Sequence, residues 1–144
     1  MIKPIVKIVT INASTFTVWE ALTNPDIMKQ WMGEPEMALE VTTDWRIGSP
    51  IAIKGFHHVN FVNKGTVLRF EPGKVLEYNY LSSLSRLPEH VDNYTIIHFE
   101  LESVEDGARL SLTVSNFPTE VIFKHVDFYW TTTLEILKKL LEKH

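Results

Sequence analysis

Alternating apolar and polar residues open the chain and predict a β-strand. From residue 5 to residue 11, one parity holds Ile5, Lys7, Val9 and Ile11 and the other holds Val6, Ile8 and Thr10, which we interpret as a first strand. The pattern changes at Ser14, a residue type that often caps helices. Phe16, Trp19 and Leu22 then recur at helical spacing, so we expect a short amphipathic helix after Ser14.

A second short helix is predicted directly after the first. Asn24 can cap it, Pro25 suits the first helical position with its fixed φ, and Asp26 complements the positive end of the helix dipole. Three large apolar residues follow at helical spacing and share one face: Met28, Trp31 and Met32.

The middle of the chain has β-type composition. Seven segments are predicted as strands: 37–43, 51–57, 59–62, 66–70, 75–81, 94–101 and 109–115. The turns between them include Gly48-Ser49-Pro50, Asn63-Lys64-Gly65, Pro72-Gly73 and Glu105-Asp106-Gly107. Because most connections are short, consecutive strands should pair as antiparallel neighbours. Residues 82–93 are long for a hairpin, which favours a mobile flap.

Helical spacing returns after Pro118 and continues almost to the end of the chain. An unbroken apolar stripe predicts one long helix: Phe123, Val126, Trp130, Leu134, Leu137 and Leu141. A strand, two short helices, a run of antiparallel strands and a long helix together make an α+β domain. A sheet curved round one helix leaves space that side chains do not fill, so we expect a ligand cavity between them.

Composition narrows the class of protein. The 144 residues suit a single domain over the whole chain, and 44% hydrophobic against 22% charged residues is typical of a soluble globular protein. The lack of cysteine excludes disulfides and thiolate chemistry and fits a cytoplasmic location. A net charge of -4 argues against nucleic acid as a partner, and no apolar run is long enough for membrane insertion.

Four segments form a recognisable series of motifs. They are Val18-Trp19-Glu20-Ala21-Leu22-Thr23-Asn24-Pro25-Asp26 followed by Trp31, then Asp44-Trp45-Arg46-Ile47-Gly48, then Gly65-Thr66-Val67 with Val75-Leu76-Glu77-Tyr78, and finally Trp130 with Leu134, Leu137 and Glu142. In this order they resemble the activator of heat-shock protein 90 ATPase homologue family. That family belongs to the superfamily of START and birch-pollen-allergen (Bet v 1) domains.

The resemblance covers nearly the whole chain and implies a helix-grip fold. In that fold a curved antiparallel β-sheet wraps around a long C-terminal α-helix, in the order one strand, two short helices, six strands and one helix. The family is functionally mixed, so the resemblance implies an internal cavity but no common reaction. Ser49 and Tyr129 stand where the family often has glycine, and Tyr80 where it often has tryptophan. An inward Tyr129 would fill part of the ligand space.

The candidate site consists of side chains that could converge on the space between sheet and helix. Methionine adapts to varied apolar shapes, and tyrosine brings a hydroxyl to an apolar wall. The predicted ligand-cavity residues are Met28, Trp31, Met32, Tyr78, Tyr80, Phe123, Trp130 and Leu134, with Arg46 as a polar anchor and Leu84, Leu87 and Val91 closing the mouth. The competing interpretation is that the apolar members are ordinary core residues, because stripes at helical spacing usually are.

No recognised motif for catalysis or metal binding accompanies these residues. Nucleophile, phosphate-loop, dinucleotide and zinc motifs are missing, so we expect no catalytic residue, metal or cofactor. His57 and His58 are adjacent on a predicted strand and should point to opposite faces. His98, Glu100 and Glu102 share the face opposite to apolar residues, so we expect them to face solvent.

Three functions remain open. The leading hypothesis is noncatalytic binding of a small hydrophobic or amphipathic ligand, with a stress-response role implied by the resemblance. An enzyme of the polyketide cyclase or dehydratase kind would need inward polar groups, for which Arg46, Tyr80 and His57 are the best candidates. The third is a partner module acting on a heat-shock chaperone ATPase. Both a monomer and a homodimer are compatible with the sequence.

Overall fold

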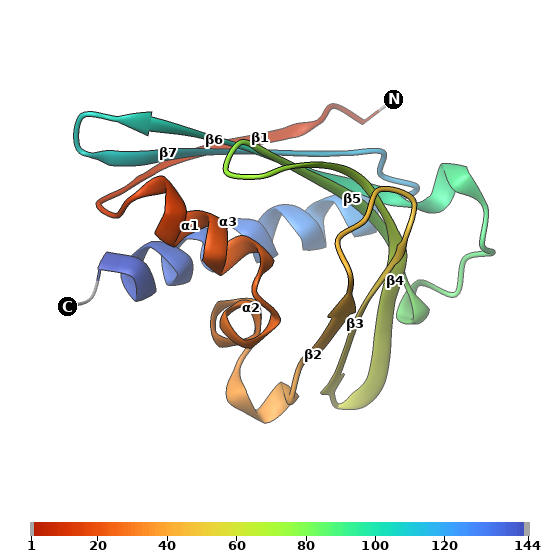
Figure 1. Ribbon diagram of the computed structural model, residues 1–144. Coiled ribbons are helices and arrows are strands. Elements are labelled where there is room, and N and C mark those ends of the chain that lie inside the picture. The colour runs from red at the N-terminus through yellow and green to blue at the C-terminus, as the bar shows by residue number, and fades with distance from the viewer. Residues whose placement is uncertain (1, 143–144) are drawn as a thin grey trace.

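The computed structural model describes residues 2–142 and has one curved antiparallel sheet with helices against its concave face (Figure 1). Its strands are β1 (Ile5–Ile11), β2 (Glu40–Thr43), β3 (Pro50–His57), β4 (Val59–Glu71), β5 (Val75–Ser82), β6 (Thr95–Val104) and β7 (Gly107–Ser115). They pair in the order β1-β7-β6-β5-β4-β3-β2. The first strand therefore lies beside the last, and from β7 to β2 each strand lies beside its neighbour in the sequence.

The helices begin where the sequence predicts. They are α1 (Thr15–Thr23), α2 (Pro25–Trp31) and α3 (Glu120–Glu142), with short 3-10 segments η1 (Pro35–Met37), η2 (Ser83–Ser85) and η3 (Val91–Asn93) in the connections. The Ser14 hydroxyl accepts the Thr17 N–H, and the Asn24 side chain accepts the Asp26 N–H, so both predicted N-caps are confirmed. None of the described helices is long and apolar enough to cross a membrane.

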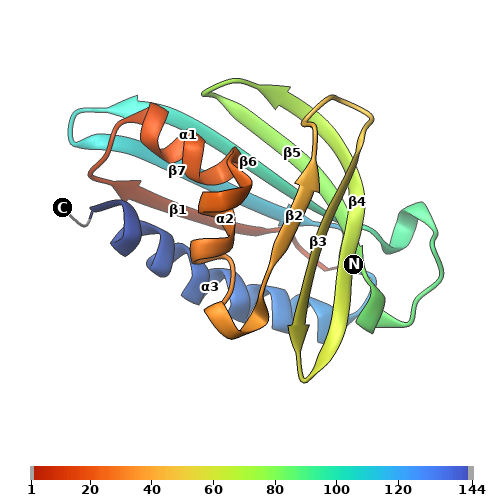
Figure 2. The ribbon, with the colours of Figure 1, turned by 60° about the horizontal axis from the view of Figure 1, so that its bottom comes forward.

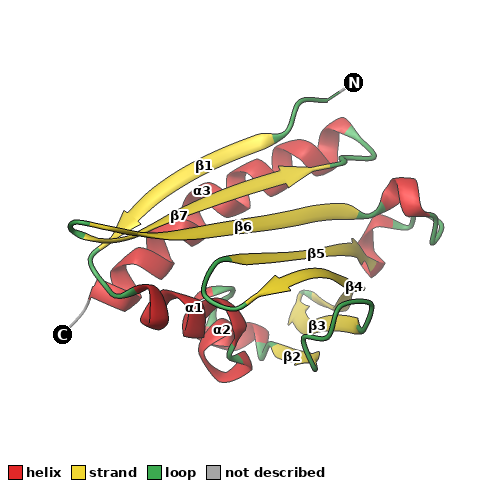
Figure 3. Cartoon of the chain, turned by 45° about the horizontal axis from the view of Figure 1, so that its top comes forward, coloured by secondary structure: helices red, strands yellow, loops and turns green. Residues whose placement is uncertain are grey.

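The core lies between the sheet and α3. Figure 2 shows β2, β3 and β4 turned away from the β1–β7 end of the sheet, so that the sheet curves around α3. In Figure 3 the strands lie in front and α3 runs behind β1 and β7. Val126, Trp130, Leu134 and Leu137 of α3 are buried, as the apolar stripe predicts. The α+β helix-grip fold expected from the sequence is confirmed.

The predicted turn at Asn63-Lys64-Gly65 is wrong, because β4 runs through it as one strand. At Gly65 a Cβ atom would lie 1.9 Å from the Asn79 carbonyl oxygen of β5. The Asn79 side chain also accepts the Thr66 N–H at 2.8 Å. This glycine therefore permits a close approach of two strands and does not form a turn.

Two other strand predictions need correction. The predicted strand 37–43 begins only at Glu40, because Pro35–Met37 forms a 3-10 turn and Ala38 has a φ of 47°. His57 and His58 do not point to opposite faces: their ring centroids are 4.7 Å apart. His58 connects β3 to β4 with a φ of 67°, which breaks the alternation of a strand.

The long connection between β5 and β6 is tied to the sheet at several points. The Val62 N–H of β4 donates to the Ser83 hydroxyl at 2.9 Å, and Lys64 forms an ion pair with Glu89. Near the end of this connection, the carbonyls of Asp92 and Tyr94 accept hydrogen bonds from the Asn116 side chain. Its expected action as a mobile flap stays a prediction.

Candidate functional site

Aromatic side chains from several elements meet between α3 and the sheet. The Trp130 ring of α3 lies 6.2 Å from that of Trp31 in α2 and 5.7 Å from that of Phe99 in β6, measured between centroids. The Trp31 indole N–H donates to the Ala21 carbonyl at 2.9 Å, which fixes its ring. The Tyr129 ring packs edge-on against Trp130 at 5.1 Å.

Tyr78 and Tyr80 extend this group along the inner face of β5. They are two residues apart on one strand, so their side chains leave the sheet on the same side. Tyr78 is only 3% exposed, and Tyr80 is half-buried against the same core. We call Trp31, Tyr78, Tyr80, Phe99, Tyr129 and Trp130 the inner aromatic cluster.

The three phenols of this cluster are neutral at physiological pH. Burial raises the pKa of Tyr78, and the nearby phenols of Tyr129 and Tyr80 raise it further. Burial raises the pKa of Tyr80 to about 12. Burial also raises the pKa of Tyr129, although a hydrogen bond with Thr133 lowers it in part. Each phenol therefore keeps its proton as a hydrogen-bond donor.

The hydroxyls differ in how they are paired. Tyr129 donates its hydroxyl hydrogen to the Met32 carbonyl at 2.6 Å, which joins α3 to the end of α2. Within residues 2–142, neither Tyr78 nor Tyr80 has a hydrogen-bond partner for its hydroxyl. No fully enclosed side-chain nitrogen or oxygen in that range lacks a partner. The hydroxyls of Tyr78 and Tyr80 must therefore reach space that water can enter.

Charged side chains do not contribute to this interior. Apart from tyrosine and tryptophan, the only polar residues buried among those described are Thr95 and Thr133. Every described Asp, Glu, Lys, Arg and His is at least partly exposed. The interior thus combines an apolar aromatic wall with neutral hydroxyl groups.

Most of the predicted site residues lie in this region. Six are buried, namely Met28, Trp31, Met32, Tyr78, Trp130 and Leu134. Tyr80 and Phe123 are half-buried and pack against the same core. In the β5–β6 connection Leu87 is half-buried, whereas Leu84 is 51% and Val91 is 72% exposed. The structure does not bring Arg46 to the cluster, since it lies exposed between β2 and β3.

Sequence reasoning missed Phe99, Thr133 and the role of Tyr129. Phe99 shares its strand parity with the buried Ile97, which was an available signal for the inner face. Thr133 lies three residues after Trp130 and so falls on the buried side of α3. For Tyr129, the only signal in the sequence was that tyrosine replaces a glycine common in the family. Its hydrogen-bond acceptor, the Met32 carbonyl, is 97 residues away.

The polar set proposed for a cyclase is not assembled. Arg46 precedes β3 and His57 ends it, so the length of the strand, about 25 Å, separates them. Both side chains are exposed, whereas Tyr80 is half-buried at the core. Tyr80 is thus the only one of the three that belongs to the inner aromatic cluster.

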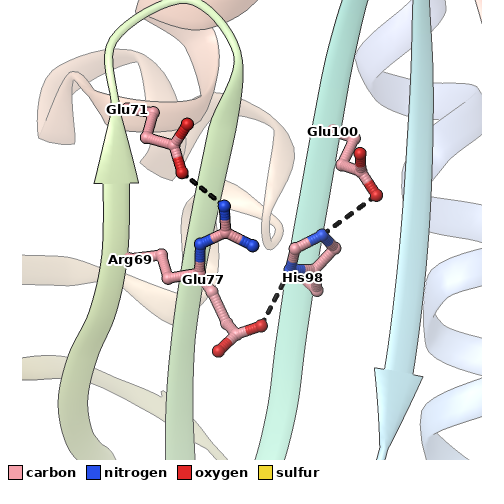
Figure 4. Close-up of polar contacts among 5 residues, drawn as sticks. All are labelled: Arg69, Glu71, Glu77, His98 and Glu100. Atoms are coloured by element: carbon pink, nitrogen blue, oxygen red, sulfur yellow. Dashed lines mark hydrogen bonds and ion pairs between the residues drawn. The ribbon is translucent and has the colours of Figure 1, made fainter.

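A second group of polar side chains lies on the outer face of the sheet (Figure 4). The His98 ring sits between two carboxylates, with Nδ1 2.8 Å from Glu77 and Nε2 3.1 Å from Glu100. Arg69 pairs with Glu71 beside them. Glu102, the third member of the predicted set, pairs with Arg109. No group of three His, Asp or Glu residues within 2–142 is arranged to hold a metal ion.

Open surface pockets lie away from the inner aromatic cluster. One of about 750 Å³ lies where Asn12, Asp106 and Lys138 meet at one end of the molecule. Another of about 440 Å³ is lined by residues of β3, β4 and β5 together with Val91 and Tyr94. Neither includes Tyr78 or Tyr80.

Comparisons with known proteins agree with this architecture. A family model described as activator of Hsp90 ATPase homolog 1-like protein matches residues 12–142. A solved protein from Cytophaga hutchinsonii is 36% identical, with a TM-score of 0.81, over 98% of this chain and 94% of its own. The Aha1 dimer from Colwellia psychrerythraea is 24% identical, with a TM-score of 0.77, over 99% and 98%. DynU16, from the dynemicin biosynthetic locus, is 17% identical, with a TM-score of 0.77, over 99% of this chain and 48% of its own. No curated protein sequence matches significantly.

Proposed function

Since the chain belongs to the activator of Hsp90 ATPase homolog 1-like family, we propose that it binds a small hydrophobic or amphipathic ligand without catalysing a reaction. The proposed site lies between α3 and the concave face of the sheet. Tyr78 is the observation that supports it most: its side chain is 3% exposed, yet its hydroxyl has no partner among the described residues. A ligand that replaced water beside this hydroxyl would lie near the phenol of Tyr129, whose ring packs against Trp130.

Binding can be tested by NMR titration with N-phenyl-1-naphthylamine, a neutral aromatic probe. The indole N–H signals of the four tryptophans report on different places in the fold. We expect the Trp31 and Trp130 signals to shift, while the signal of Trp19, which packs against Phe70, should move least. If the shifts gather at Tyr94 and Val91 on the outer pocket instead, the proposed site is wrong.

A blocking substitution tests the same site independently. Leu134→Trp adds volume at a buried position of α3, whereas Ile136→Trp adds it at a position that is 45% exposed. Leu134→Trp should abolish probe binding and lower stability by about 1–3 kcal/mol, and Ile136→Trp should bind as the wild type does. Circular dichroism confirms that each variant is folded. Unchanged binding by folded Leu134→Trp would contradict the proposal.

Other functions remain proposals with less support. A cyclase or dehydratase would have to use the inner hydroxyls alone, because Arg46 and His57 lie outside the cluster. The similarity to the Aha1 dimer of Colwellia psychrerythraea motivates tests of this chain for self-association by sedimentation and for a change in chaperone ATPase rate. The stress-response role and the cytoplasmic location also stay predictions.

A further inference from the structure

We infer that the ligand is an uncharged molecule with a hydrogen-bond-accepting oxygen, such as a carbonyl, and that the hydroxyls of Tyr78 and Tyr80 donate to it. This inference rests on the proposed function and adds the chemistry of the ligand. It depends on which hydroxyl hydrogens are free, which charges are absent from the interior and how the two tyrosines are placed on β5.

The free donors are identified by the hydrogen bonds already made. The Tyr129 hydroxyl uses its only hydrogen on the Met32 carbonyl, so toward a ligand its oxygen can only accept. Tyr78 and Tyr80 make no such bond among the described residues and keep their hydrogens available. Both emerge from the same face of β5, so both can approach one apolar ligand. A ligand oxygen with two lone pairs could accept from either hydroxyl.

The lack of buried charge selects against ionised ligands. Among residues 2–142 no charged side chain is buried, and apart from tyrosine and tryptophan the only buried polar residues are Thr95 and Thr133. A carboxylate in this interior would lose its hydration without gaining a cation, which disfavours it strongly. Arg46, the predicted polar anchor, is exposed between β2 and β3 and does not supply that cation. Fatty acids and other carboxylates should therefore bind less well than neutral compounds of the same shape.

Three naphthalene compounds of similar size separate these effects. We propose isothermal titration of the full chain at pH 7.5 with 2-acetylnaphthalene, 2-ethylnaphthalene and 2-naphthoate. The first has a neutral carbonyl, the second lacks an acceptor, and the third is ionised. We expect the ketone to bind about five-fold more tightly than the hydrocarbon, the usual effect of one net hydrogen bond. The naphthoate should bind most weakly.

Substitutions then test which tyrosine hydroxyl donates the hydrogen bond to the ketone. Tyr78→Phe and Tyr80→Phe keep the ring and remove the hydroxyl, so each should reduce the preference for the ketone over the hydrocarbon. Tyr94→Phe is the matched control, because Tyr94 lies at the outer pocket and its hydroxyl should not matter. The carbonyl stretch of the bound ketone, measured by infrared difference spectroscopy, should move to higher frequency in Tyr78→Phe.

The outcomes distinguish the inference from the proposed function. If ketone and hydrocarbon bind equally, and neither tyrosine substitution alters their ratio, the site binds ligands but the inference is wrong. If 2-naphthoate binds best, the inference is also wrong, since the interior then tolerates an anion. If none of the three compounds binds the wild-type chain, the proposed function fails and the inference fails with it.

Discussion

Tyr78 and Tyr129 show how two residues of one type can have opposite roles in the same interior. Both rings lie in the inner aromatic cluster, and burial raises the pKa of both phenols. The Tyr129 hydroxyl bonds to the Met32 carbonyl and so supports the fold, whereas the Tyr78 hydroxyl bonds to nothing described. The first contributes to stability, and the second is available for the ligand that we propose.

This difference predicts unequal effects on stability. Tyr129→Phe should lower the free energy of unfolding by about 1 kcal/mol, because it removes a hydrogen bond between α3 and the end of α2. Tyr78→Phe should change it by less than about 0.5 kcal/mol, since no protein hydrogen bond is lost. Urea denaturation of both variants measures the difference. Equal losses would show that the two hydroxyls do not differ in this way.

The buried phenols also predict a loss of stability at alkaline pH. Below pH 10 the phenols are protonated in both the folded and the unfolded chain. Above the ordinary pKa of 10.0 the unfolded phenols ionise, whereas Tyr80 keeps its proton in the folded chain up to about 12. The free energy of unfolding should therefore fall between pH 10 and about 12, by about 1.4 kcal/mol per pH unit for each such tyrosine.

Urea denaturation at pH 9, 10 and 11 measures this slope. Tyr80→Phe is the control, because it removes one titrating phenol and should give a shallower decline than the wild type. Parallel declines in the two proteins would contradict a protonated Tyr80 in the folded chain.

At the scale of elements, Asn24 serves two helices. Its backbone N–H donates to the Glu20 carbonyl at the end of α1, and its side chain accepts the Asp26 N–H at the start of α2. Asn24→Ala should lower the free energy of unfolding by about 1 kcal/mol, the usual effect of losing an N-cap. Asn24→Asp keeps the accepting oxygen and should be nearly neutral. Thermal melts compare the two variants, and a melt of Asn24→Ala like that of the wild type would count against the cap.

Gly65 sets the path of β4 against β5. A Cβ atom here would meet backbone, the Asn79 carbonyl oxygen at 1.9 Å, which cannot move away as a flexible side chain could. Gly65→Ala should therefore lower the free energy of unfolding by more than about 2 kcal/mol. Gly73 has a φ of 76° but open space around it, so Gly73→Ala should cost only about 1 kcal/mol. The reverse order in urea denaturation would exclude close strand approach as the reason for this glycine.

At the scale of the whole molecule, polar contacts hold β1 against α3. The Lys7 ammonium lies 2.9 Å from the Asp127 carboxylate and donates to the Thr131 hydroxyl at 2.8 Å. Farther along, Lys138 donates to the Thr10 carbonyl at 2.7 Å. These contacts join the first strand to the last helix, so the two ends of the described chain stabilise each other.

Lys7→Met tests the contacts between β1 and α3, since methionine keeps the length of the side chain and removes its charge. We expect a loss of about 0.5–1 kcal/mol at low ionic strength, because the pair is only partly buried. In 1 M salt the difference from the wild type should shrink, because salt screens the ion pair. A difference that does not depend on salt would indicate lost packing and not lost charge.

What the sequence determined by itself was local. Ser14 and Asn24 cap helices through bonds to residues two or three positions away, and the α3 stripe follows from helical periodicity, so both can be found without knowing the fold. The inner face of the sheet was partly predictable as well. Tyr78 and Tyr80 share strand parity, and parity fixes which side of a sheet a residue occupies.

Tertiary structure decided which side chains have partners. In the sequence Gly65 resembles a turn residue, but in the fold Asn79 of the next strand lies against it. Arg46 matches a family motif but lies outside the cluster, and Tyr129 finds its acceptor 97 residues away. Periodicity and capping depend on neighbours within a few residues, whereas hydrogen bonds across the core depend on how distant elements pack. The tertiary structure therefore decided that the Tyr129 hydroxyl bonds to Met32 while the Tyr78 hydroxyl has no partner among the described residues.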